Sequence, residues 1–397
     1  MKQINRKKCA YDTILNLFAV GLPIILLQLI VLPIVGNKVG QIEYGFIIAI
    51  ISLSTVFSQS FGSALNNSRL INDKLYKNQK IIGDYNFLLS VSNLINVIII
   101  IIVSMILIDN ISFFDIITLV VISTFSLIRN YLIVEFRIKL NYKKILIENI
   151  IMTLGYLIGL LMFYLFGLWH FIYITGYLFS FLYLVKTTNL LKESYKLTTL
   201  FKFTFKETSI LFISGLFLTS LQYTDKLIML PLLGSRVVSV YYSASIIGKI
   251  LMMVIVPLSS VILSYLIRFT EIKKSLFNKL CISLLLLSIP TYFLMFFVSK
   301  PALNILYPQW SMESQEIVPY ILIGVVFQIL TTVLNPIILK FRNISWQMRI
   351  NLLSLLVYIS FSILLYYMYG LTGFCIGISM SQIVRFFYIV YVYNFKK

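Results

Sequence analysis

Long apolar segments follow one another along the whole chain and are separated by short polar segments. A helix needs roughly 20 apolar residues to cross about 30 Å of hydrocarbon, and this spacing predicts about 12 transmembrane helices. Their predicted ranges are 13–35, 42–64, 86–108, 113–134, 146–166, 170–185, 209–231, 238–265, 280–299, 317–339, 350–369 and 373–392. The first range is longer than the apolar region of a signal peptide, and no A-x-A site follows it, so we expect it to be retained.

Composition supports a membrane protein. Apolar residues make up 59% of the chain and charged residues 12%, and the mean hydropathy is +0.94. Such a chain has too few polar side chains to cover a compact soluble fold. The sequence therefore predicts an all-α polytopic membrane protein.

The positions of Lys and Arg predict the orientation. With the N-terminus in the cytoplasm, 26 of the 33 Lys and Arg residues fall in cytoplasmic segments, and the external segments hold only Lys38, Arg236 and Lys300. This is the asymmetry of the positive-inside rule, so we expect both termini in the cytoplasm. The net charge of +19 then serves orientation and attraction to anionic membrane lipids, and no nucleic-acid partner is expected.

A short motif occurs twice. LPIVGNKV at Leu32–Val39 matches LPLLGSRV at Leu230–Val237, and the offset of 198 residues is half of the chain. This repeat predicts a duplication into two parallel six-helix lobes, 1–195 and 196–397, joined through the loop at 186–207. We expect each copy at the external end of the first helix of its lobe, where its Pro ends or bends the helix and its Gly closes the turn.

Four cations lie inside predicted spans: Arg129, Lys226, Lys249 and Arg385. A charge at the bilayer centre costs at least about 2.5 kcal/mol, so each needs a polar cavity, a partner or access to the interface. Lys249 and Arg385 lie nearest the predicted midplane, which favours a functional role. Arg129 is within reach of the cytoplasmic interface by snorkelling, so simple anchoring remains open.

Asp225 is the only carboxylate that the prediction places well inside a span. Adjacent residues point about 100° apart on a helix, so we expect Asp225 and Lys226 to find partners on other helices rather than each other. Two interpretations stay open for Asp225, a proton or sodium relay and a structural ion pair.

Enzyme chemistry finds little support in the sequence. The single His170 sits beside Trp169 in a segment typical of an interfacial aromatic belt. Cys9, Cys281 and Cys375 are far apart, and no C-x-x-C, P-loop or G-x-G-x-x-G motif is present. We expect no catalytic residues, no metal and no cofactor.

Two segments resemble a known family. Glu43–Ile71, which contains FGSALNNSR, and Asp225–Ile262, which begins with an acid-base pair before a Leu-Gly turn, are similar to the Wzx-type polysaccharide repeat-unit flippases. The external segment 300–322 is also similar to the family's loop, whereas Ser239 departs from the family, which often has Gly there. The resemblance places the chain near the multidrug/oligosaccharidyl-lipid/polysaccharide exporter superfamily and implies a MATE-like fold.

The resemblance implies a flippase of the bacterial cytoplasmic (inner) membrane. Such a protein moves undecaprenyl-diphosphate-linked O-antigen or capsule repeat units to the external leaflet by alternating access, as a step of lipopolysaccharide or capsule biosynthesis. It also implies coupling to a proton or sodium gradient, and polysaccharide polymerase and chain-length proteins as partners.

An anionic diphosphate crosses a low-dielectric region more easily in a cavity lined with cations. Arg129, Lys226, Lys249 and Arg385 are the residues we expect in that lining. Lys38 and Arg236 either receive the headgroup at the external mouth or anchor the chain at the interface.

Two alternatives stay open. A cation-coupled multidrug exporter of the same superfamily has the same number of helices, but its cavity must attract cations, and the first span here contains no carboxylate. A membrane polysaccharide polymerase or ligase usually carries a large external loop, which the predicted topology does not provide.

Overall fold

The computed structural model describes residues 6–108, 111–266, 272–342 and 344–395. Lys2, Arg268, Lys396 and Lys397, which contribute to the predicted charge asymmetry, lie outside these ranges. Within the described residues every regular element is helical and no strand occurs. The prediction of an all-α fold is therefore confirmed.

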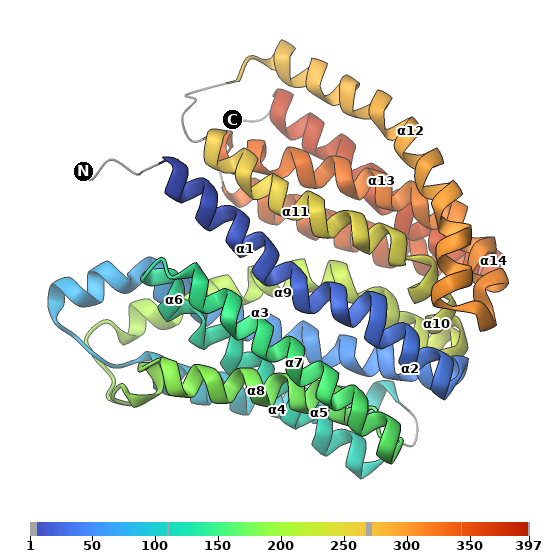
Figure 1. The fold of residues 1–397 in the computed structure, drawn as a ribbon. Helices are drawn as coiled ribbons and strands as arrows, with labels where there is room; N and C mark the ends of the chain where they lie inside the picture. The colour runs from blue at the N-terminus through green and yellow to red at the C-terminus, as the bar shows by residue number, and fades with distance from the viewer. Residues whose placement is uncertain (1–5, 109–110, 267–271, 343, 396–397) are drawn as a thin grey trace. The chain divides into compact units, whose positions relative to one another are not determined.

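The first half of the chain contains a broken helix followed by a series of long helices (Figure 1). The elements are α1 (Arg6–Leu26), a π-helical turn (Leu27–Val31), α2 (Leu32–Val39), α3 (Gln41–Gln79), α4 (Tyr85–Leu107), α5 (Phe113–Leu132), α6 (Val134–Ile138), α7 (Tyr142–Phe166) and α8 (His170–Thr187). A short 3-10 turn at Leu190–Lys192 follows α8.

Within the described residues, the second half contains six helices and one further 3-10 turn. The elements are α9 (Phe201–Leu233), α10 (Ser235–Ala244), α11 (Ile246–Leu266), α12 (Lys274–Leu306), the 3-10 turn (Pro308–Trp310), α13 (Ser311–Phe341) and α14 (Ile344–Phe395).

Local sequence explains several helix ends. The Ser112 hydroxyl accepts a hydrogen bond from the backbone N–H of Asp115 at 3.0 Å and so caps the start of α5. Asn141 caps α7 in the same way through the backbone N–H of Lys144. At the other end of α7, Gly167 has φ +75°, the left-handed conformation that glycine adopts without strain.

Within the described residues, eight helices are long and apolar enough to span a membrane, and α10 with α11, bent by 51°, forms a ninth candidate. One of the eight, α14, accounts for two predicted crossings because its backbone leaves the helical conformation at Gly370, with φ 61° and ψ −140°. A Cβ at Gly377 would lie 2.5 Å from Ser362 Cα, so the two arms of α14 pack closely against each other.

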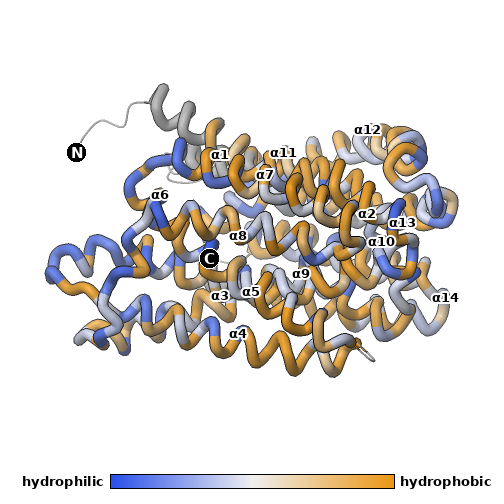
Figure 2. Tube along the Cα trace, turned by 60° about the horizontal axis from the view of Figure 1, so that its bottom comes forward, coloured by the Kyte–Doolittle hydropathy of each residue, from blue (hydrophilic) through white to orange (hydrophobic). Residues whose placement is uncertain are grey.

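Helices α8 and α9 occupy the sixth and seventh predicted crossings but are less apolar than the other spans. The physical reason is their polar content, which includes several tyrosines in α8 and the Asp225–Lys226 pair in α9. Large apolar side chains on other helices are exposed, for example Leu165 at 78% and Phe297 at 71%. Figure 2 shows hydrophobic residues along most of the helices and hydrophilic residues mainly in connections and at helix ends. These features are those of a multi-pass membrane protein.

Contacts divide the chain into two compact units: unit 1 comprises Met1–Val35 and Ile47–Leu232, and unit 2 comprises Gly36–Phe46 and Leu233–Lys397. Helix α9 therefore belongs to unit 1 with the helices of the first half, and residues 36–46 belong to unit 2. The lobes 1–195 and 196–397 describe the duplication of the sequence and remain a prediction.

Unit 1 holds α9 and the connection before it by specific contacts. The rings of Phe61 and Phe212 stack at 4.0 Å, and the Ser60 and Thr219 hydroxyls lie 2.8 Å apart. The fully buried Asp84 carboxylate accepts a hydrogen bond of 2.7 Å from the backbone N–H of Thr198. The connection 188–200 is thus a docked part of unit 1 rather than a loose tether.

Unit 2 has a core where α12, α13 and α14 meet, which includes Phe277, Leu334 and Phe386. Residues 36–46 pack on α10 and on the segment before α13. Tyr44 Oη lies 2.8 Å from Tyr307 Oη, and a Cβ at Gly45 would lie only 1.7 Å from the backbone oxygen of Ser235. Glycine at position 45 permits this close approach.

The two copies of the repeated motif adopt different conformations, which corrects the expectation of two equivalent turns. In the first copy Leu32–Val39 is entirely helical, and the turn comes afterwards at Gly40, with φ +87°. In the second copy the turn is at Gly234, with φ +82°. Gly36 instead provides room for Trp310 and Tyr44, because a Cβ there would lie 3.2 Å from both rings. Neither motif proline ends a helix, since Pro33 lies inside α2 and Pro231 inside α9.

Candidate functional site

Arg129 forms a buried ion pair within unit 1. Its Nε and Nη2 donate to the two carboxylate oxygens of Glu148, at 2.7 and 3.1 Å, and Nη2 also donates to Asn149 Oδ1 at 3.0 Å. The Ser180 hydroxyl donates to the same carboxylate, which is fully buried. This ion pair joins α5, α7 and α8 and accounts for the burial of Arg129 without a ligand.

Glu148 was missed as a functional candidate because the predicted fifth span begins at residue 146, which left its carboxylate at a helix end. The structure begins α7 at Tyr142 and buries Glu148 completely. The adjacent polar residues Glu148 and Asn149 in an otherwise apolar stretch were the available signal.

Lys226 and Asp225 pair with each other, which corrects the expectation of partners on other helices. Lys226 Nζ lies 2.5 Å from Asp225 Oδ1 and 3.0 Å from the backbone oxygen of Gln222, and the lysine is 3% exposed. Adjacent helix positions diverge, but the four-carbon side chain of lysine is long enough to fold back along α9. The pair carries no net charge when Asp225 is ionised.

Lys249 and Arg385 lie in unit 2 with different partners. Lys249 Nζ is 3.0 Å from the centre of the Tyr242 ring, in a cation-π contact, and 3.5 Å from the backbone oxygen of Tyr242. Arg385 Nη2 donates to Asn351 Oδ1 at 3.2 Å. The Nε of Arg385 is buried and has no hydrogen-bond partner within the described residues.

Contacts with α13 place Lys249 and Arg385 in the middle part of unit 2. Gly248, next to Lys249, packs on Val325, and Phe386, next to Arg385, has its ring 5.7 Å from that of Phe327. Val325 and Phe327 are two residues apart, a rise of about 3 Å along the helix. The contact of Ser379 with Gly324 places Arg385, six residues later, about 9 Å beyond Gly324. The two midspan cations that the sequence predicts therefore lie within about two turns of each other along α13.

Unit 2 has few carboxylates. Among its described residues the acidic side chains are Glu43, Glu313 and Glu316, at the start of α3 and of α13. Residue 313 precedes Val325 by twelve residues, about 18 Å along α13. Glu313 is therefore far from the level of Val325 along α13, and cations outnumber carboxylates among the described residues of unit 2.

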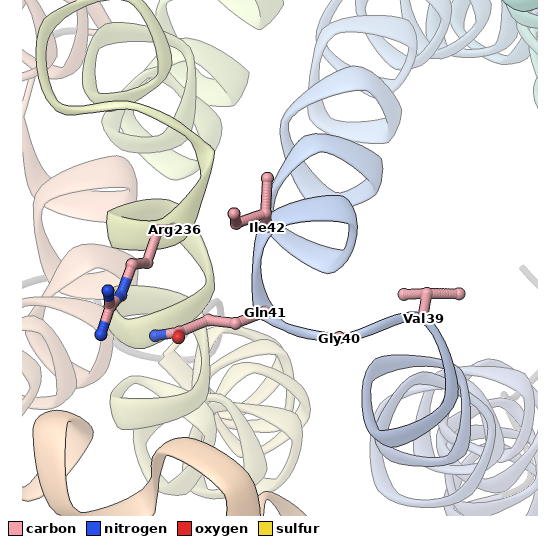
Figure 3. Close-up of a pocket in the computed structure, with 5 residues that line it drawn as sticks. All are labelled: Val39, Gly40, Gln41, Ile42 and Arg236. Carbon is pink, nitrogen blue, oxygen red and sulfur yellow. The ribbon is translucent and has the colours of Figure 1, made fainter.

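Arg236 lies on the surface of unit 2, at the end that the topology assigns to the outside. Its Nη2 lies 2.7 Å from Glu313 Oε1, and Gln41 Nε2 donates to the other oxygen of Glu313 at 2.9 Å. Gln41 and Arg236, with Val39, Gly40 and Ile42, line a shallow pocket of about 300 Å³. Figure 3 shows the polar ends of Gln41 and Arg236 on the same side of this pocket. Lys38, on α2, is exposed.

His170 has a polar partner beyond the predicted aromatic belt. Its Nε2 lies 2.7 Å from Asp115 Oδ1, and its ring stacks on Trp169 at 3.8 Å. This contact ties the start of α8 to the start of α5 in unit 1. No group of three or more potential metal ligands occurs in the part of the chain that the structure describes.

Comparison with solved structures identifies the fold. No protein-family model matches the chain, and no curated protein matches it in sequence. The lipid II flippase MurJ in an inward closed conformation aligns with a TM-score of 0.67 and 16% identity, covering 98% of this chain and 86% of that one.

Multidrug transporters align over similar lengths. An inward-facing MATE family transporter of the MOP superfamily gives a TM-score of 0.64 at 11% identity, covering 97% of this chain and 100% of that one. The eukaryotic MATE transporter AtDTX14 gives 0.62 at 15% identity, with coverages of 98% and 96%. The chain therefore has the fold that MurJ shares with the MATE transporters, which confirms the predicted MATE-like architecture.

Proposed function

We propose that the chain is a flippase that moves an undecaprenyl-diphosphate-linked oligosaccharide, an O-antigen or capsule repeat unit, from the cytoplasmic to the external leaflet. The observation that carries this proposal is the pair of cations Lys249 and Arg385, whose neighbours pack on α13 within about two turns of each other in a unit with few carboxylates. Membrane interiors rarely contain such groups unless they serve a polar substrate or pathway. The similarity in fold to a lipid II flippase supports the same conclusion.

The charge of the substrate explains why cations are needed. An isolated anion loses tens of kcal/mol of solvation in a medium of low dielectric, whereas a cation about 4 Å away restores about 4 kcal/mol at an effective dielectric constant of 20. Arg385 presents a fork of donors suited to phosphate oxygens, and its buried Nε has no hydrogen-bond partner within the described residues. Lys249 supplies a second positive charge in unit 2.

The paired cations enter the proposal differently. Arg129 and Lys226 can contact a diphosphate only after they leave their carboxylate partners. Lys226 leaves Asp225 most simply when Asp225 becomes protonated or binds a sodium ion. In this scheme Asp225 is the ion-coupling residue, and Lys38 and Arg236 meet the headgroup at the external end. The proposal includes a bacterial inner-membrane location, cytoplasmic termini, and work alongside a polysaccharide polymerase and chain-length proteins.

A cation-coupled multidrug exporter is the second candidate, because MATE transporters match the fold nearly as well as MurJ does. The two candidates differ in the charge of the substrate. A site around Lys249 and Arg385 repels organic cations and attracts phosphates, so the charged residues favour the flippase.

The proposal is tested by reconstitution in liposomes that contain a fluorescent lipid-linked oligosaccharide diphosphate. We expect the full chain to expose the probe at the opposite leaflet, and Lys249→Gln and Arg385→Gln each to slow exposure at least tenfold at equal protein incorporation. Lys300→Gln, which removes an exposed cation of unit 2, is the matched control. The proposal would be overturned if both Lys249→Gln and Arg385→Gln flipped the probe at an unchanged rate. It would also be overturned if the protein exported a cationic dye but did not flip the lipid.

A further inference from the structure

Six cations gather at one end of unit 2, where α12 begins, α13 ends and α14 both begins and ends. We name Lys273, Lys274, Lys279, Lys340, Arg342 and Arg349 the basic corner. The predicted topology assigns this end to the cytoplasm. The acidic residues of α13 lie at its other end. Glu313, at the start of α13, is 29 residues from Arg342, which is about 43 Å along the helix.

Hydrogen bonds draw two of these cations to a single helix end. Arg342 Nη2 donates to the backbone oxygen of Tyr393, and Lys274 Nζ donates to the backbone oxygen of Asn394, the next residue. The end is itself held in place, since Tyr393 Oη donates to the backbone oxygen of Ile272 at 2.8 Å. The two positive charges are therefore fixed close together by the last turn of α14.

The helix end offsets only part of this charge. The C-terminus of a helix carries about half a negative charge, against two full positive charges from Lys274 and Arg342. Glu271, the acidic residue that precedes the corner in sequence, lies outside the described residues, and one carboxylate cannot balance six cations. The corner keeps a net positive charge under any placement of Glu271.

Unit 1 is different at the end that the topology assigns to the same side. There Arg69 pairs with Glu193 at 2.6 Å, Lys77 with Asp73 at 2.6 Å, and Lys139 with Glu135. These cations have carboxylate partners within the protein. Unit 1 carries further cations at this end as well. The basic corner differs in that the described helix ends around it contain no carboxylate.

The basic corner also contains guanidinium groups held against aromatic rings. The Arg342 guanidinium stacks over the Tyr393 ring at 4.4 Å, and its Nε is buried with no partner within the described residues. Arg349 stacks on the Trp346 ring at 4.7 Å. Arg342 Nη1 also donates to the backbone oxygen of Phe341 at 2.8 Å. Each terminal nitrogen of this guanidinium therefore keeps one further N–H, which suits a phosphate oxygen.

We propose that the basic corner binds the phosphate of an anionic lipid of the cytoplasmic leaflet, with Arg342 and Lys274 as its principal contacts. The position at the membrane-facing end of three helices favours a lipid headgroup over free phosphate. This site is separate from the transport path of the proposed function and stands whether or not the chain is a flippase. It would anchor the end of unit 2 to the leaflet.

Native mass spectrometry of the full chain in detergent tests the site, with phosphatidylglycerol and phosphatidylcholine as probes. We expect phosphatidylglycerol to bind preferentially and the double variant Lys274→Gln/Arg342→Gln to weaken its binding about 30-fold, because each cation near an anionic headgroup contributes about a factor of five. The matched control is Lys77→Gln/Lys139→Gln, which removes two exposed cations that have carboxylate partners.

Arg342 also caps α13, so its loss alone can disturb folding. Lys274→Gln therefore serves as a second variant, with about a fivefold loss expected and recovery in Lys274→Arg. The proposal is overturned if phosphatidylcholine binds equally well, if the control pair loses as much affinity, if Lys274→Gln has no effect, or if millimolar inorganic phosphate displaces the lipid and so marks a free-ion site.

Discussion

The ion pair of Arg129 with Glu148 gives the sharpest stability prediction. Replacing Glu148 by Met leaves a guanidinium that is only 14% exposed without its carboxylate partner. Two charges about 4 Å apart attract by about 4 kcal/mol at an effective dielectric constant of 20, and breaking a buried pair typically costs about 3–5 kcal/mol. We expect Glu148→Met and Arg129→Met each to lower the free energy of unfolding by about 3–5 kcal/mol.

The double variant Arg129→Met/Glu148→Met separates the pair from its surroundings. Because no charge remains buried, its loss should be smaller than the sum of the two single losses, with a coupling of at least about 2 kcal/mol. Denaturant unfolding of the purified chain in detergent, followed by tryptophan fluorescence, measures all four proteins. Lys139→Met is the control, since its ion pair with Glu135 is 61% exposed on the lysine side and such pairs contribute about 0–1 kcal/mol. The reasoning is refuted if the double variant loses as much free energy of unfolding as the two single variants together.

Three further predictions concern other parts of the chain. Gly45→Ala should lower the melting temperature markedly because a Cβ would lie 1.7 Å from a backbone oxygen of α10. Gly215→Ala should change the melting temperature little because the nearest atom to its Cβ would be 3.9 Å away. Equal shifts in the two variants would contradict this packing. Asp84→Ala should increase the rate at which trypsin cleaves the connection 188–200 several-fold. An unchanged cleavage rate would show that the connection is held by other contacts. Asp225→Asn leaves Lys226 buried without a carboxylate, so folded yield should fall and recover in Asp225→Asn/Lys226→Met; the reasoning fails if the double variant folds no better.

Periodicity and length in the sequence predicted most of the fold. Apolar runs located the helices, including both arms of α14, because crossing a bilayer imposes a length and a composition that local sequence shows directly. Helix α9 was located as well, but its assignment to unit 1 was not predictable. That assignment depends on contacts between residues far apart in sequence, such as Phe61 with Phe212.

Site residues were harder to predict than helices. Intramembrane cations are visible in a sequence because they are costly, so Arg129, Lys226, Lys249 and Arg385 could all be selected. Their partners could not, because side-chain reach and helix packing determine them. Lys226 folds back onto Asp225, and Arg129 meets a carboxylate 19 residues away on another helix.

The repeated motif shows the same limit. Eight similar residues predicted two similar turns, but one copy is helical throughout and the other turns at Gly234. The difference comes from tertiary packing, since Trp310 and Tyr44 occupy the space beside Gly36. Sequence similarity between the two copies therefore did not determine a common conformation.

The exchange of segments between the two units has a consequence for how the chain folds as it is synthesised. Unit 1 includes residues up to Leu232, and unit 2 includes residues 36–46. The first six crossings therefore cannot complete their unit when they leave the ribosome, and must wait for α9 to insert. Residues 36–46, made among the first, meet their partners only when α10 and the segment before α13 have been made. A chain cut in the connection 188–200 would yield two fragments, neither of which contains a whole unit.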